Sequence, residues 1–170
     1  MAQYQGFAHV YGDNIDTDRI IPGKYTKTLD ISELAKHALE DLDPQFVQRV
    51  KPGDILVAGD NFGSGSSREQ APIAIKAAGI AVVVARSFAR IFYRNAINIG
   101  LPVVEIAADD HQTTSGDTVL VDLIAGQFIN QSSGYNTNIT RMPPALQAIL
   151  DAGGLVNYLK QYGDYPAEMF

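Results

Sequence analysis

Short apolar runs alternate with amphipathic segments through the central part of the chain. Residues 55–58, 80–85 and 101–106 are almost continuously apolar, which is typical of strands covered on both faces. Between them, the segments 70–79 and 91–99 have apolar residues at helical spacing and stop at a glycine. This succession of strands and helices predicts right-handed crossovers and a parallel sheet.

The flanking segments predict further elements on both sides of this block. Helical spacing, alternation and turn residues indicate a strand at 6–10, helices at 30–41 and 45–50, a hairpin at 116–130, and helices at 143–150 and 155–162. The first of these helices begins at Asp30 or Ser32, and the tail after residue 162 is expected to be loose. With 170 residues and no internal repeat, the chain 1–170 is expected to form one domain.

A glycine- and serine-rich loop joins the first strand and helix of the central block. Residues 63–68 read Gly-Ser-Gly-Ser-Ser-Arg, so backbone N–H groups and hydroxyls can converge on an anion at the positive end of a helix. Arg68 adds a fork that suits a carboxylate or a phosphate. The loop lacks the third glycine of a dinucleotide fingerprint and the Gly-Lys-Ser/Thr ending of a P-loop. We predict an anion site, although a plain strand–helix connection explains the same residues.

The serines of this loop have a structural alternative, because Ser66 and Glu69 match a capping box. Pro72 argues against that role, since a helix capped by Ser66 would carry a proline beyond its first turn. The helix is therefore expected to begin near Glu69 or Gln70, which leaves Ser66 and Ser67 to face a ligand. A kinked helix start would restore the capping role.

Charge and cysteine content narrow the classes of function. The formal net charge of −6 argues against nucleic acid as a partner, and no apolar run is long enough to span a membrane. Without a secretory signal, a cytoplasmic location is expected. The chain has no cysteine and its histidines, His9, His37 and His111, lack metal-ligand spacing. It is therefore expected to hold neither an iron–sulfur cluster nor another metal by itself.

Two further loops carry charged residues whose role the pattern leaves open. Residues 13–19 contain three aspartates and superficially resemble a calcium loop, but they lack the EF-hand glycine and final glutamate, so turn capping is the simpler interpretation. Lys24 and Lys27 stand beside hydroxyl residues on the next loop, where they would bind a negatively charged substrate or simply be solvated.

Three motifs, taken together, resemble one known family. The chain resembles the swivel domain of the aconitase superfamily, and within it the small subunits of 3-isopropylmalate dehydratase and homoaconitase, over nearly its whole length. The resemblance rests on the motifs at residues 16–25, 63–69 and 87–95. It implies an α/β fold, a swivelling β/β/α three-layer domain with a partly parallel central sheet. It also implies a large-subunit partner that carries a 4Fe–4S cluster.

The resemblance assigns expected roles to residues of the first two motifs. Ser66 would be the base that removes a proton from the carbon beside a carboxylate, and neighbouring positive charge must then stabilise its alkoxide. Asp18 would assist proton transfer on the hydroxyl side. Further residues would bind the substrate, through the carboxylate or through the loop that selects the side group: Gly65, Ser67, Arg68, Lys24 and Lys27.

The implied activity is that of a hydro-lyase that acts only with its large subunit. It would isomerise 2-isopropylmalate and 3-isopropylmalate by dehydration and rehydration in leucine biosynthesis, on a small hydroxy-carboxylate substrate. A lysine in the selecting loop suits an extra carboxylate, so homoaconitase or 2,3-dimethylmalate dehydratase is an alternative. A non-catalytic anion-binding module is the alternative from another class.

Overall fold

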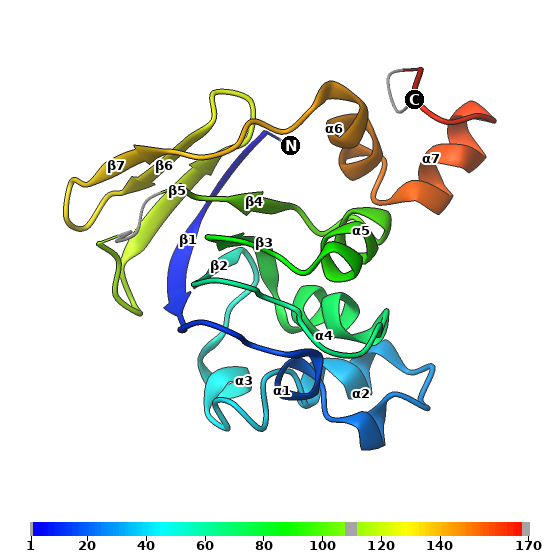
Figure 1. Ribbon diagram of the computed structural model, residues 1–170, viewed down its shortest axis with the longest axis horizontal. Helices are drawn as coiled ribbons and strands as arrows, with labels where there is room; N and C mark the ends of the chain where they lie inside the picture. Colours follow the sequence, from blue (N-terminus) through cyan, green and yellow to red (C-terminus); the bar gives the residue numbers. More distant parts are fainter. Residues whose placement is uncertain (1, 108–111, 168–170) are drawn as a thin grey trace.

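The computed structural model describes residues 2–107 and 112–167 (Figure 1). Within these residues, seven strands form one mixed sheet in the order β4-β3-β2-β1-β5-β6-β7. The strands are β1 (Gln3–Val10), β2 (Asp54–Ala58), β3 (Ile80–Ala85), β4 (Val103–Glu105), β5 (Thr118–Asp122), β6 (Gln127–Asn130) and β7 (Asn136–Asn138). Strands β1 to β4 are parallel to one another, whereas β5, β6 and β7 pair antiparallel.

The helices lie partly on the side of β1–β4 that is opposite to β5–β7 and partly below these strands in the view of Figure 1. They are α1 (Thr17–Ile20), the 3₁₀ turn η1 (Gly23–Tyr25), α2 (Ile31–Lys36), α3 (Phe46–Arg49), α4 (Gln70–Ala78), α5 (Arg90–Asn98), α6 (Pro144–Asp151) and α7 (Leu155–Tyr162). The resulting layers, sheet on sheet on helices, confirm the predicted α/β fold class. None of the helices in the described residues is long and apolar enough to cross a bilayer.

The parallel half of the sheet follows directly from the apolar runs of the sequence. All five residues of β2 are buried, as are five of the six residues of β3, because one face of these strands meets the helices and the other meets the second β layer. The crossover helices α4 and α5 lie between β2, β3 and β4 in the chain, as the pattern predicts.

Strand β1 belongs to both halves of the sheet. Its residues 3–7 pair antiparallel with β5, whereas residues 8–10 pair parallel with β2. At the change of partner, Gly6 lies so close to the Gly53 carbonyl that a Cβ atom on Gly6 would stand 2.2 Å from that oxygen. Glycine at position 6 is therefore a condition for the two β layers to meet on one strand.

The predicted helix 30–41 is wrong in its second half. Asp30 caps α2 by accepting a hydrogen bond from the Ser32 N–H at 2.9 Å, but the helix ends at Lys36. Leu39 has a φ of +57°, which a right-handed helix does not allow. Its N–H donates instead to the Ile20 carbonyl at 2.8 Å, so a tertiary contact with α1 overrides the helical spacing.

Smaller differences concern the lengths of strands. The predicted strand 6–10 extends back to Gln3 because β5 provides a second partner, and the strand at 101–106 shortens to Val103–Glu105. The hairpin is confirmed as β5 and β6, with β7 as an additional short edge strand.

We predict that Gly6→Ala lowers the free energy of unfolding by about 1–3 kcal/mol, because the added methyl group forces the β1 and Gly53 backbones apart. Gly12→Ala is the matched control, since a Cβ at Gly12 meets nothing within 4 Å. Urea denaturation of both variants measures the difference. Equal stability of the two variants would contradict the tight crossing at Gly6.

Candidate active site

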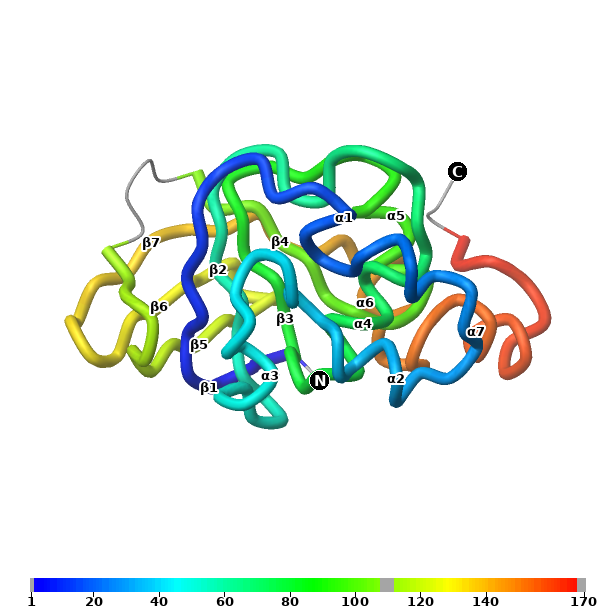
Figure 2. Tube along the Cα trace, turned by 90° about the horizontal axis from the view of Figure 1, so that it is seen from below, coloured from blue at the N-terminus to red at the C-terminus, as the bar shows by residue number. Residues whose placement is uncertain are grey.

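The loops that follow β1, β2 and β3 lie along one edge of the molecule, at the top of Figure 2. This is the carboxyl edge of the parallel strands, where open α/β sheets bind ligands. Here Asp13 accepts hydrogen bonds from the Asp60 N–H at 2.8 Å and from Arg86 at 2.9 Å. The Asp60 N–H bond, followed by Arg86, lowers the pKa of Asp13 below its ordinary value. The network fastens the three loops to one another.

The glycine-serine loop is held against the start of α1. The Gly63 N–H donates to the Ile15 carbonyl, and the Thr17 N–H donates to the Ser64 carbonyl, each at 2.8 Å. The Thr17 hydroxyl then donates to the Ser66 carbonyl at 3.0 Å. Thr17 is buried, so these bonds fix the backbone that carries Ser66.

Arg68 and Asp18 come together although 49 residues separate them in the chain. The Arg68 guanidinium forms an ion pair with Asp18 and also approaches the Ile21 carbonyl at 3.4 Å. The Arg68 side chain is only 22 % exposed, whereas Asp18 is 65 % exposed. A Cβ on Gly23 would lie 3.3 Å from the guanidinium, so the turn η1 packs directly on Arg68.

A hollow of about 200 Å³ opens between this loop and α5. Its walls come from Thr17, Gly63, residues 65–68, residues 89–92 and Asn95. The first turn of α5 lines the hollow, and its N-cap residue Ala89 makes no side-chain capping hydrogen bond. The N-terminus of α5 therefore directs free N–H groups and a positive dipole end towards the hollow, whereas no residue of α4 lines it.

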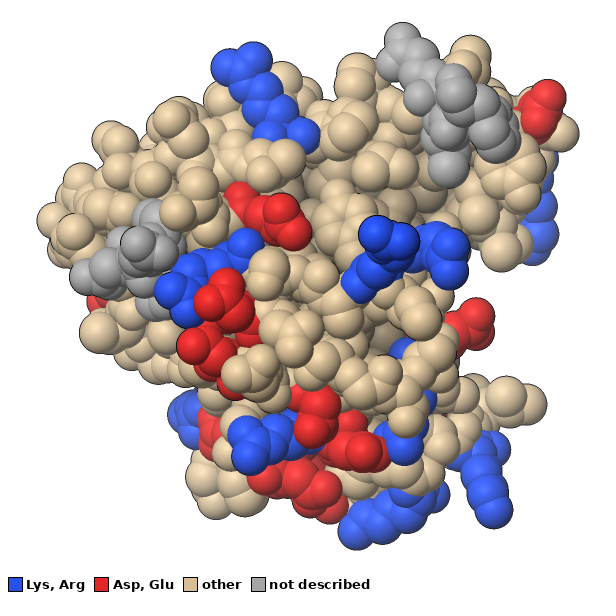
Figure 3. All heavy atoms as spheres, in the orientation of Figure 1, with Lys and Arg blue, Asp and Glu red and all other residues tan. Residues whose placement is uncertain are grey.

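The start of α4 contradicts the capping interpretation of the serines. The helix begins at Gln70, as predicted, and Ser66 is not its cap. Ser66 and Ser67 are exposed and line the hollow, which is the arrangement that an anion site requires. Figure 3 shows Lys and Arg side chains gathered over α5 on the face turned to the viewer, beside a hollowed region.

The lysine-bearing loop reaches this site from the side of α2. The Lys24 ammonium group lies 3.7 Å from the Glu40 carboxylate and over the ring of Tyr25. A hydrogen bond with Tyr25 and the charge of Glu40 raise the pKa of Lys24. The ring of Tyr25 also stacks on His37 with centroids 3.7 Å apart. Lys27 is exposed. The structure thus gives Lys24 a partner outside the hollow, and the role of both lysines in substrate selection stays a prediction.

Gln70 joins this loop to the first turn of α4. Its amide donates to the Thr26 carbonyl at 3.0 Å, next to Lys27 in the chain. Together with the packing of Gly23 on Arg68, this bond keeps the lysine-bearing loop beside the residues that follow Ser66.

The histidines and the acidic loop have structural partners. His9 forms a buried pair with Asp54 at 2.8 Å, and His37 lies 2.5 Å from Glu40, while His111 is outside the described residues. Asp16 caps α1 through the Arg19 N–H. In the part of the chain that the structure describes, no three His, Cys, Asp or Glu side chains gather in a way that would hold a metal ion.

The chain is similar to known proteins of one family. The aconitase C-terminal domain family matches residues 24–109. The 3-isopropylmalate dehydratase small subunit of Caldicellulosiruptor bescii is 57% identical over 157 residues, which cover 92% of this chain and 95% of the relative. Small subunit 1 of Methanopyrus kandleri is 54% identical over 159 residues, or 94% of each chain.

The chain belongs to the family of 3-isopropylmalate dehydratase small subunits. A solved structure of 3-isopropylmalate dehydratase from Methanocaldococcus jannaschii superposes with a TM-score of 0.89 at 48% identity and covers 95% of both chains. The resemblance found in the three motifs is confirmed, and with it the fold class. A small subunit also implies a large-subunit partner, whereas the roles of the individual site residues stay predictions.

Some residues of the site were not selected from the sequence. Thr17 acts through its buried hydroxyl, and Arg90 and Asn95 reach the hollow from α5. All three stand inside the motifs that carried the family resemblance. Their positions in these motifs were therefore the available signal, but only the folded chain shows which of them face the hollow.

We predict that Thr17→Val lowers kcat about tenfold or more, because the Ser66 carbonyl loses its donor and the loop loosens. Thr17→Ser keeps the hydroxyl and should retain most of the activity. Steady-state kinetics of the two variants, each combined with the large subunit, makes the test. A valine variant as active as the serine variant would show that the hydrogen bond does not position Ser66.

Proposed function

We propose that the chain works as the small subunit of a hydro-lyase that interconverts 2-isopropylmalate and 3-isopropylmalate by dehydration and rehydration. The observation that supports this most directly is the hollow in which Ser66, Ser67 and Arg68 meet the N-terminus of α5. Such a site suits a substrate with carboxylates, and the identity with relatives of that name extends over nearly the whole chain.

In this proposal Ser66 is the base that takes the proton from the carbon beside a substrate carboxylate. A free serine is far too weak for this step, so its alkoxide has to be stabilised by its surroundings. The hollow provides the N-terminus of α5, together with the guanidinium group of Arg68. Because Thr17 fixes the Ser66 backbone, the hydroxyl is placed before the substrate arrives.

Arg68 and Ser67 bind the carboxylate next to the reacting carbon, with the N–H groups of the loop around Gly65 as further donors. Asp18 already holds one side of the Arg68 guanidinium, which orients the fork towards the hollow. From this position Asp18 also serves the proton transfer on the hydroxyl side of the substrate.

The second half of the site belongs to the large subunit. We propose that it carries a 4Fe–4S cluster, which supplies the Lewis acid that takes the substrate hydroxyl group. The present chain contributes the base and the carboxylate-binding groups, and it is therefore inactive when isolated.

We predict that Ser66→Ala lowers kcat by about 10³-fold or more in the complex and leaves the affinity for substrate largely intact. Ser64→Ala is the matched control, because Ser64 belongs to the same loop but not to the lining of the hollow. The absorbance of the unsaturated intermediate measures turnover. Calorimetric titration of the complex with substrate measures the affinity. Near-normal turnover of Ser66→Ala would remove the catalytic role of Ser66.

The exposed Lys27 favours a second candidate, the same chemistry on an acid with an additional carboxylate such as homoaconitate. We predict that Lys27→Leu shifts the ratio of kcat/KM values towards isopropylmalate about tenfold, because a charged partner for that carboxylate is lost. Lys36→Leu, on the exposed face of α2, is the control. An unchanged ratio of kcat/KM values would show that the residue at position 27 does not recognise the charge of the substrate side group.

A further inference from the structure

A second cavity lies directly beside the Ser66 hollow, across the segment that leads into α5. It measures about 330 Å³ and is larger than the hollow itself. Phe88, Val104 and Met142 make much of its lining apolar, and Arg90 lines both cavities. The two openings are therefore neighbours on one face of the molecule.

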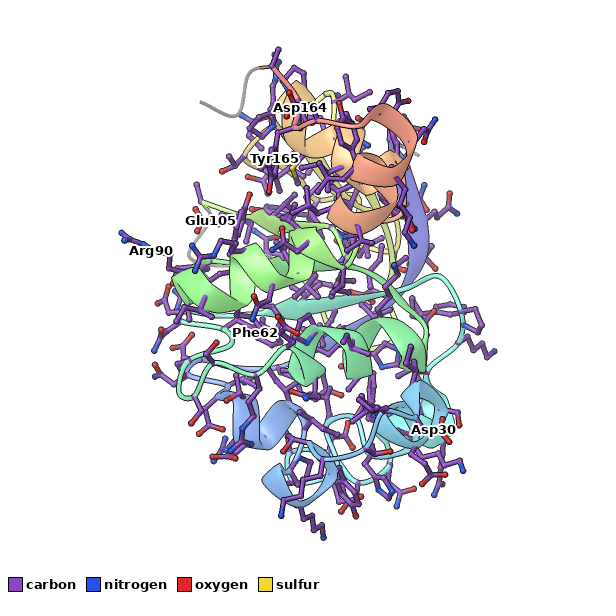
Figure 4. All side chains as sticks on the ribbon, turned by 90° about the vertical axis from the view of Figure 1, so that its right-hand side faces the viewer. Asp30, Phe62, Arg90, Glu105, Asp164 and Tyr165 are labelled. Carbon is purple, nitrogen blue, oxygen red and sulfur yellow. The ribbon has the colours of Figure 1, made fainter. Side chains whose placement is uncertain are left out.

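Three charged side chains line this cavity. Arg90, Arg141 and Glu105 all line it, and in the described residues none of the three forms an ion pair. Figure 4 shows Arg90 and Glu105 on the same side of the ribbon, with Arg90 projecting away from the body. Tyr93 also lines the cavity, and burial, followed by the Glu105 charge, raises the pKa of Tyr93.

We propose that this cavity is the docking site for the large subunit, which inserts an apolar side chain next to an acidic residue that pairs with Arg90 and Arg141. This inference rests on the proposed function, because it takes the large subunit as the occupant. The dry hollow that a Ser66 alkoxide requires has to be closed by that partner. Because Arg90 lines both the hollow and the adjoining cavity, a partner that covers the hollow also covers the cavity.

The chemistry of the lining selects the occupant. An apolar floor of this size accepts one or two side chains, and such filled pockets supply most of the energy of a protein interface. Two arginines against one glutamate favour an acidic neighbour for the inserted side chain. Glu105 repels an acid placed on its own side and so fixes the orientation of the inserted segment.

Two variants test the proposal without altering the Ser66 hollow. Thr140→Trp fills the cavity from an exposed position on its rim, and Arg141→Glu reverses one of the charges. Asn136→Trp on β7 and Lys160→Glu on α7 are controls at exposed positions away from the cavity. Calorimetry with the anaerobically purified large subunit measures the dissociation constant of the complex for each variant.

We expect both cavity variants to raise this dissociation constant about tenfold or more, while the two controls stay within about twofold. Turnover at saturating large subunit should then remain near that of the wild type.

Unchanged affinity of both cavity variants overturns the proposal. It is also overturned if the variants change only the self-association of the isolated chain, since the occupant would then be a second copy. If Thr140→Trp does not fold, Arg141→Glu decides alone.

Failure of the proposed function gives a different result. In that case the wild-type complex would form but turn over none of the acids, while the dissociation constants would still decide whether the cavity is the docking site.

Discussion

The close approach of the glycine-serine loop to two helices at once is the constraint on which the site depends. Gly63 lies against α5, where a Cβ would stand 2.2 Å from the Phe92 ring, and its φ of +80° is one that glycine adopts without strain. On its other side the Gly63 N–H bonds to the Ile15 carbonyl. A side chain at position 63 would push the loop away from α5 and so separate Ser66 from the N-terminus of that helix.

The fold and the site differ in how much of each could be predicted from the sequence. The apolar runs of β2 and β3, the start of α4 at Gln70 and the hairpin were predictable because local pattern and tertiary packing agree there. The end of α2 was not, because a distant contact of Leu39 with Ile20 overrides local spacing. The Arg68–Asp18 pair and the Thr17–Ser66 bond likewise join residues that only the fold brings together.

The distribution of charge explains how a chain with a net charge of −6 can present a site for an anion. Several acidic groups are held by partners inside the chain: Asp13 by Arg86, Asp54 by His9 and Asp43 by Arg49. Two cations of the site face differ, because Arg90 and Arg141 have no ion-pair partner among the described residues. Local field rather than net charge therefore decides what this face attracts.

The sharing of β1 between two β layers has a consequence for the newly made chain. The half of β1 that pairs with β2 finds its partner once residue 58 has been synthesised, whereas residues 3–7 wait for β5 at residues 118–122. Until then the amino-terminal half of β1 is an open strand edge, which other chains can pair with. Such distant pairings also form slowly. Emergence of β5 from the ribosome is thus the moment at which this edge of the nascent protein becomes protected from aggregation.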